Sequence, residues 1–133
     1  MNVGAQFADA ASQFLGTKFR LHGRDPSYGL DCVGLVCVSL QTIGREYHAP
    51  EGYSLRNTRP LAWSDFAHKS GFIDVTDGVL PGDVMMLRPG PAQQHLVIFE
   101  NERSCIHAHA GLKRVVREPI AIPRACLAHW RLT

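Results

Sequence analysis

The sequence lacks any long apolar run: no segment approaches the roughly 20 apolar residues that a membrane-spanning helix needs. Residues 1–17 also lack the basic start and unbroken apolar stretch of a secretory signal. Aromatic residues are few, at 8%, but 45% of the chain is hydrophobic and 20% is charged, as in ordinary soluble globular proteins. We therefore expect no membrane partner, and a protein that is cytoplasmic as synthesised.

A dominant charge is missing as well. The formal net charge is +2, and the 14 Lys and Arg residues form no run of five or more. Nucleic-acid binding normally requires a basic patch or stripe. The composition therefore gives no reason to expect a nucleic-acid partner.

The cysteines and histidines show none of the common metal-binding spacings. The chain has four cysteines but no Cys-x-x-Cys and no His-Glu-x-x-His. The alternating pair His107 and His109 could turn two imidazoles toward one ion, but two ligands of this kind are a weak pattern. We expect no metal, no cofactor and, for a chain kept in a reducing compartment, free thiols.

The spacing of apolar residues changes from helical in the first half to β-type in the second. Helical spacing occurs over residues 5–15 and 32–43, each followed by a glycine, and a short helix is expected over 61–70. Short β-favouring runs separated by Gly, Pro and charged turns follow at 83–88, 94–100, 104–109, 114–117 and 126–132.

These patterns predict the fold class and the domain organisation. A chain of 133 residues fits one domain. Helices first and strands afterwards indicate an α+β architecture. We therefore predict a single domain over residues 1–133, with N-terminal helices packed on a C-terminal antiparallel sheet or small barrel of about five strands.

Cys32 is the candidate nucleophile because it opens the predicted helix 32–43 directly after a loop rich in turn formers. Asp31 is suited to cap that helix. Unpaired backbone N–H groups and the helix dipole at this end are expected to lower the pKa of the Cys32 thiol. The alternative is that Cys32 is a small buried residue, like Cys37 deeper in the same helix.

Two histidines on neighbouring predicted strands are candidates for the general base and its partner. A three-residue connection over 100–102 would pair residues 95 and 107 and place both imidazoles on one face of the sheet. A two-residue turn would put them on opposite faces unless a bulge intervenes. With His95 as base and His107 fixing its tautomer, a Cys-His-His set results. Taken alone, either histidine would be a packing or surface residue.

Five segments stand in the order of a known family: Phe14 to Arg20, Leu30-Asp31-Cys32-Val33-Gly34-Leu35-Val36, Leu80-Pro81-Gly82-Asp83-Val84, Gln94-His95-Leu96-Val97-Ile98-Phe99, and Cys105-Ile106-His107-Ala108. In these segments the sequence resembles the NlpC-type papain-like peptidases, which cleave peptide stems of the bacterial cell wall. The resemblance implies that Cys32 attacks an amide carbonyl, that His95 serves as base and then as acid, and that His107 orients His95.

This chain departs from the family at two positions beside the expected site. The family usually has Tyr where this chain has Phe19, and Ser where it has Val33. His22 or Tyr28, in the same loop, could supply a replacement polar group. We therefore expect the substrate-binding residues to be Asp31, Val33, Phe19 and His22.

The resemblance implies a cysteine hydrolase that acts on peptidoglycan stem peptides, between D-glutamate and the diamino acid. The Asp-Cys-x-Gly-Leu-Val form of the motif and the lack of a signal resemble the branch encoded with bacteriophage or gene-transfer-agent tail genes. Tail proteins would then be partners and the virion tail the place of action. Two alternatives are an inactive structural tail component and a secreted toxin amidase with the same site.

Overall fold

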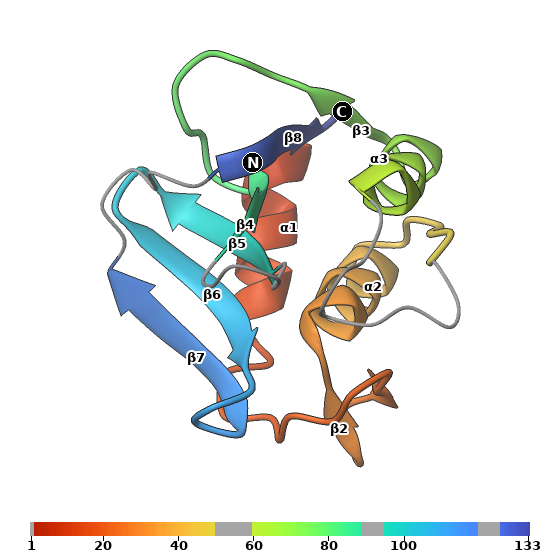
Figure 1. Cartoon of the computed structure of the whole chain (residues 1–133), viewed down its shortest axis with the longest axis vertical. Helices are drawn as coiled ribbons and strands as arrows, with labels where there is room; N and C mark the ends of the chain where they lie inside the picture. Colours follow the sequence, from red (N-terminus) through yellow and green to blue (C-terminus); the bar gives the residue numbers. More distant parts are fainter. Residues whose placement is uncertain (1, 50–59, 89–94, 120–125) are drawn as a thin grey trace.

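The computed structural model describes residues 2–49, 60–88, 95–119 and 126–133. In these parts of the chain, helices α1 (Val3–Ser12), α2 (Cys32–Thr42) and α3 (Pro60–Lys69) accompany a six-stranded antiparallel sheet (Figure 1). No described helix is long and apolar enough to cross a membrane. The sheet has the order β3-β8-β4-β5-β6-β7, and its strands are β3 (Phe72–Asp74), β4 (Val84–Leu87), β5 (His95–Asn101), β6 (Ser104–His109), β7 (Arg114–Pro119) and β8 (Cys126–Leu132).

The main core lies between the helices and one face of this sheet. Leu35 and Leu40 of α2 pack there with Ile98 of β5 and Ile106 of β6. The opposite face of the sheet carries a smaller buried cluster: Met85, Val97, Phe99 and Cys105. Successive residues of β5 therefore alternate between two buried faces, which explains why this strand reads as a continuous apolar run.

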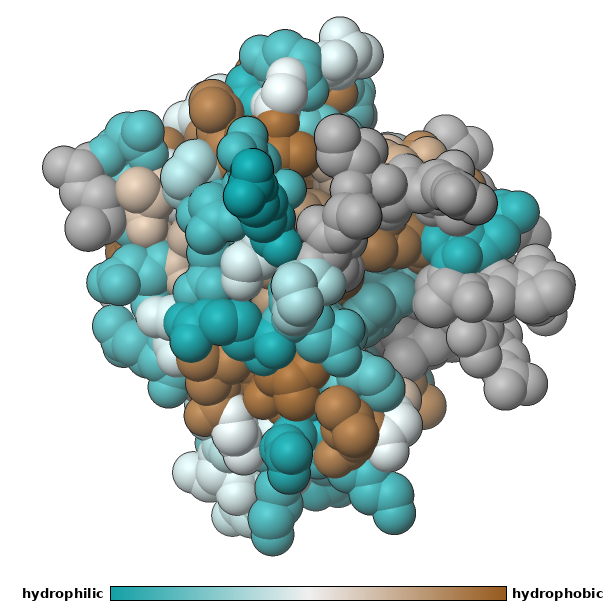
Figure 2. Space-filling view, turned by 90° about the vertical axis from the view of Figure 1, so that its left-hand side faces the viewer, coloured by the Kyte–Doolittle hydropathy of each residue, from teal (hydrophilic) through white to brown (hydrophobic). Residues whose placement is uncertain are grey.

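The surface beside β7 is mostly hydrophilic, with hydrophobic side chains gathered in its lower part (Figure 2). Exposed large hydrophobic residues in the described chain include Leu112, in the turn between β6 and β7, and Leu21 and Tyr28, in the loop before α2.

The predicted α+β fold is confirmed, and the helices lie within three residues of their predicted bounds. The five predicted runs correspond to β4 through β8, although residue 94 lies outside the described residues. The sheet has one more strand than expected, because β3 is too short for its pattern to stand out and pairs only with β8 at the edge. The loop before α2 also contains a small hairpin, β1 (Arg24–Asp25) with β2 (Gly29–Leu30).

The predicted register of the β5–β6 hairpin is wrong in detail. Phe99 pairs with Cys105 rather than with residue 103, and Asn101 pairs with Ser104 across a two-residue turn. Between these pairs the register shifts at Glu100, which is the extra residue of a bulge. Because the shift from the predicted register is two residues, the side chains of His95 and His107 still share one face of the sheet.

The first turn of α2 approaches the backbone of the preceding loop very closely. A Cβ atom on Gly34 would collide with the carbonyl oxygen of Gly23. The carboxylate of Asp31 connects the same two segments, because it accepts hydrogen bonds from the N–H groups of Gly34 and His22, both at 2.8 Å. The loop is therefore fixed against the start of the helix that carries Cys32.

Replacement of Gly34 by Ala should destabilise the protein by about 1–3 kcal/mol, because the added methyl group has no space beside Gly23. Gly78 is the matched control: nothing lies within 4 Å of a Cβ added there, and Gly78→Ala should change stability by less than about 0.5 kcal/mol. Urea denaturation of both variants measures the difference. Equal stability of the two variants would refute the close approach.

Candidate active site

Cys32 is the first residue of α2, and backbone N–H groups surround its sulfur. The N–H groups of Cys32 and Val33 belong to the start of the helix, and the N–H of Leu96 comes from β5. Asp31 caps the helix as the sequence indicates, through its hydrogen bond from the N–H of Gly34. The sulfur therefore lies where the positive end of α2 meets the first residues of β5.

The thiol of Cys32 is nevertheless protonated in this state. Burial, and secondarily the charge of Asp31, raise the pKa of Cys32 to about 12, although the three N–H groups act in the opposite direction. The residue is only 1% exposed. The expectation of a lowered pKa is thus wrong, because removal of water from the thiolate outweighs the stabilisation that a helix N-terminus supplies.

His95 and His107 form a close imidazole pair beside this position. Nε2 of His95 lies 2.6 Å from Nδ1 of His107, and the rings are nearly perpendicular. Burial, and secondarily the charges of His107 and His109, lower the pKa of His95 to about 3. His95 is therefore neutral near pH 7, and its Nδ1 is not used in the pair.

His107 is buried and contacts a carboxylate that the sequence interpretation missed. Its Nε2 lies 3.1 Å from Oε2 of Glu118, near the end of β7. Burial lowers the pKa of His107, and Glu118 partly opposes this effect. The sequence could have indicated Glu118 only if the predicted strand 114–117 had been extended by one residue. The alternation of side chains along that strand would then have placed Glu118 on the face of the sheet that carries His107.

The structure brings the thiol and the imidazole pair to the same region without joining them directly. Among the described contacts, the thiol of Cys32 has no hydrogen bond to the ring of His95; its contact on β5 is the N–H of the next residue, Leu96. Both partners are neutral. The arrangement therefore combines an uncharged thiol with an uncharged imidazole.

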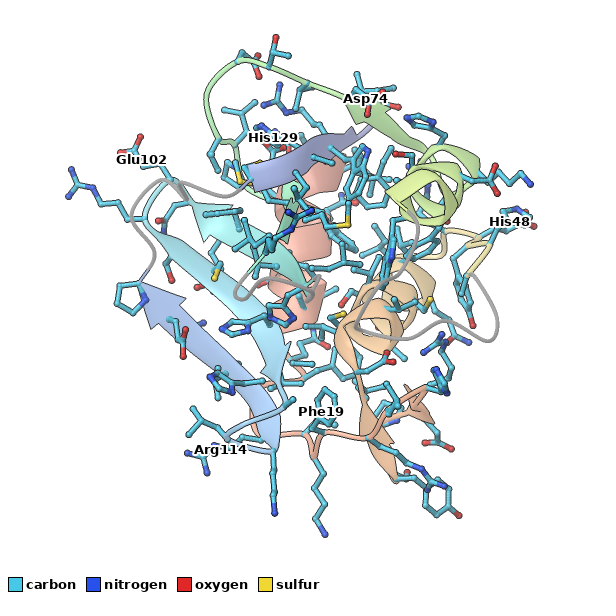
Figure 3. All side chains as sticks on the ribbon, viewed as in Figure 1. Phe19, His48, Asp74, Glu102, Arg114 and His129 are labelled. Carbon is cyan, nitrogen blue, oxygen red and sulfur yellow. The ribbon has the colours of Figure 1, made fainter. Side chains whose placement is uncertain are left out.

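Of the four residues expected to bind substrate, Asp31 and Val33 are buried, whereas Phe19 and His22 are at least partly exposed. Asp31 is fully buried and holds the loop, with a 3.1 Å ion pair to Arg24. The side chain of Val33 is fully buried in the main core and so does not reach the surface. Phe19 packs partly against the core, and Figure 3 places its ring between the sheet and β2; His22 is exposed, with a φ of 61°.

The described residues contain no group of three or more His, Cys, Asp or Glu side chains placed to hold a metal ion. His107 and His109 both approach Glu118, with His109 the more distant at 3.8 Å.

A cysteine at the start of a helix, opposite a strand that carries a histidine, defines the papain-like class of cysteine hydrolase folds. The sequence matches the NlpC/P60 family over residues 16–124, and the chain belongs to this family. No curated protein matches the sequence.

Solved structures agree with this assignment. The NlpC/p60 domain of the peptidoglycan hydrolase SagA is 25% identical, with a TM-score of 0.66, over 99% of this chain and 100% of that one. NlpC2 from Trichomonas vaginalis is 18% identical, with a TM-score of 0.69, and the match covers 96% of this chain but only 47% of that one. The peptidoglycan hydrolase RipB from Mycobacterium tuberculosis is 14% identical, with a TM-score of 0.51, over 96% and 63% of the two chains.

The raised pKa of Cys32 predicts that no thiolate forms at this residue between neutral pH and pH 9, the ordinary value for a cysteine. The ultraviolet absorbance of thiolate, taken as the difference between the wild type and Cys32→Ala, should stay at baseline over this range. A plateau of thiolate absorbance already present near pH 7 would show instead that Cys32 and His95 form an ion pair at rest.

The lowered pKa of His95 predicts a loss of stability in acid. Between pH 6.5, the ordinary histidine value, and about 3, the unfolded chain binds a proton at residue 95 that the folded chain does not. The free energy of unfolding therefore falls as the pH falls through this range. His95→Asn should make the slope of the free energy of unfolding against pH smaller, by an amount that corresponds to the uptake of up to one proton on unfolding. Urea denaturation at a series of pH values measures this slope. Equal slopes for the wild type and the variant would contradict the lowered pKa.

Proposed function

We propose that this protein is a cysteine peptidase that cleaves amide bonds in the peptide stems of peptidoglycan. The observation that carries the proposal is that the sulfur of Cys32, at the start of α2, contacts the N–H of Leu96 on β5, next to His95, which pairs with His107 of β6. Family membership supports it, as do SagA and RipB, both named peptidoglycan hydrolases. The chain spans about half the length of the two Trichomonas vaginalis structures.

In the proposed mechanism, Nε2–H of His95 donates to Nδ1 of His107, which leaves Nδ1 of His95 to accept the thiol proton. The sulfur of Cys32 attacks the amide carbonyl, and its own backbone N–H stabilises the oxyanion, a contribution of roughly 3–4 kcal/mol in known enzymes. His95 then returns the proton to the leaving amine. Water, activated by the same imidazole, hydrolyses the thioester.

The two pKa shifts decide how the nucleophile is activated. Because the pKa of Cys32 is raised to about 12 and the pKa of His95 is lowered to about 3, a resting thiolate–imidazolium pair is unfavourable. Proton transfer is therefore coupled to attack on the carbonyl, as in serine hydrolases. Since the thiol is buried, the site must also open before a substrate carbonyl reaches the sulfur.

The proposed scissile bond and the proposed place of action come from the resemblance of the sequence to the NlpC-type peptidases. The substrate bond is the one between D-glutamate and the diamino acid, and a bacteriophage or gene-transfer-agent tail delivers the enzyme to the wall. Asp31, Phe19 and His22 lie on or beside the loop that precedes Cys32, where a peptide stem would approach. Val33 is proposed to act through its backbone, because its side chain is buried.

A structural role without catalysis is the second candidate, and one observation favours it. Cys37 lies deeper in α2, has no part in the proposed site, and burial raises its pKa to about 12 as well. In this resting state, Cys32 thus resembles a packing cysteine. Under this alternative the protein is an inactive tail component that retains the fold.

Digestion of purified peptidoglycan fragments separates the two candidates. The wild type should release a new amine and shorter peptides, detected by mass spectrometry, whereas Cys32→Ala and His95→Gln should lower the rate by at least about 10³-fold. The matched control is Cys126→Ala, which removes an exposed thiol on β8 and should retain wild-type activity.

Identical products from the wild type and Cys32→Ala would refute the peptidase and leave the structural role. Fragments of different stem composition then identify the bond: cleavage should require D-glutamate next to the diamino acid. Cleavage elsewhere in the stem would retain the peptidase and refute only the assigned bond.

A further inference from the structure

Glu118 lies on the same face of the sheet as the two histidines of the site. On the β6–β7 ladder, Cys105 pairs with Glu118 and His107 pairs with Val116. Glu118 is therefore the diagonal neighbour of His107, within reach of a long side chain on that face. Its Oε2 lies 3.1 Å from Nε2 of His107.

The second oxygen of Glu118 faces another imidazole whose proton position is fixed from the far side. The backbone N–H of Leu112 donates to Nδ1 of His109 over 3.0 Å, so this ring carries its proton on Nε2. That Nε2 is 3.8 Å from Oε1 of Glu118. The carboxylate thus lies between Nε2 of His109 and Nε2 of His107.

The hydrogen bond between His95 and His107 could by itself run in either direction. If Nε2 of His95 donates, its Nδ1 has a free electron pair that can take the thiol proton. If Nδ1 of His107 donates instead, the single proton of neutral His95 sits on Nδ1 and the base is blocked. The 2.6 Å distance between the two nitrogens suits both directions equally.

We propose that Glu118 is a positioning residue that sets this direction. A carboxylate oxygen only accepts hydrogen bonds, so the proton of neutral His107 must sit on Nε2. Nδ1 of His107 is then an acceptor, Nε2 of His95 carries the proton, and Nδ1 of His95 is the basic nitrogen. Glu118 acts on the reacting atoms only through His107. The effect of Glu118 on catalysis rests on the proposed function, whereas the proton positions on the two histidines do not depend on it.

Nitrogen-15 NMR of the histidine side chains tests the inference without any substrate. In the wild type near neutral pH, His95 and His107 should both be Nε2–H tautomers. In Glu118→Ala, the Nδ1–H form of both rings should become a major species, because nothing then selects the direction of their hydrogen bond. The matched control is Glu102→Ala: Glu102 lies at the far end of the β5–β6 hairpin and pairs only with Arg103 among the described residues (Figure 3).

The wild-type spectrum alone can overturn the inference, whether or not the variant folds: an Nδ1–H tautomer at His107 would do so. Unchanged tautomers in folded Glu118→Ala would also overturn it. Because neither result depends on turnover, a protein that shows the expected tautomers but cleaves no peptidoglycan would contradict the peptidase and leave the role of Glu118 in place.

Steady-state kinetics on peptidoglycan fragments gives the second readout. Glu118→Ala should lower kcat by about 10- to 100-fold, the usual effect of removing a carboxylate that fixes a functional histidine, with little change in KM. Glu102→Ala should keep wild-type values. Loss through KM alone, with kcat unchanged, would assign Glu118 to substrate binding and refute the positioning role.

Discussion

The alternation of side chains along the β5–β6 hairpin is the constraint on which the site depends. The turn between these strands has two residues, which in a regular hairpin would send His95 and His107 to opposite faces. The single extra residue, Glu100, restores the common face. Without it the 2.6 Å contact between the imidazoles could not form, and His107 could not connect Glu118 to the proposed base.

Asp31 has two opposing effects at the other half of the site. Its carboxylate fixes the start of α2 and the preceding loop through Gly34, His22 and Arg24, and so fixes the position of the sulfur. The same buried charge raises the pKa of the neighbouring thiol. The structure therefore favours a fixed, protonated thiol, and the proposed chemistry needs a base with a defined proton position more than it needs a thiolate at rest.

Local patterns in the sequence were enough to predict the three helices, the strands β4 through β8 and the cap of α2. The apolar spacing over 32–43 and Asp31 before it predicted α2 and its first turn, and both are confirmed. The common face of His95 and His107 was predicted from strand alternation, but the predicted register was wrong, because a bulge depends on the whole ladder. The predicted direction of the pKa shift of Cys32 was wrong, because the shift is caused by burial. Burial arises from tertiary packing, which a local sequence motif does not show.

The most direct test of the central claim is to trap the covalent intermediate. Purified peptidoglycan fragments are mixed with the enzyme, the reaction is stopped with acid within one turnover, and the protein is digested and mapped by mass spectrometry. If Cys32 and His95 work together as proposed, the acyl part of the substrate should be found as a thioester on Cys32, and His95→Gln should show none. An acyl group on another cysteine, or turnover with no acyl-enzyme and with Cys32→Ala equally active, would contradict the account.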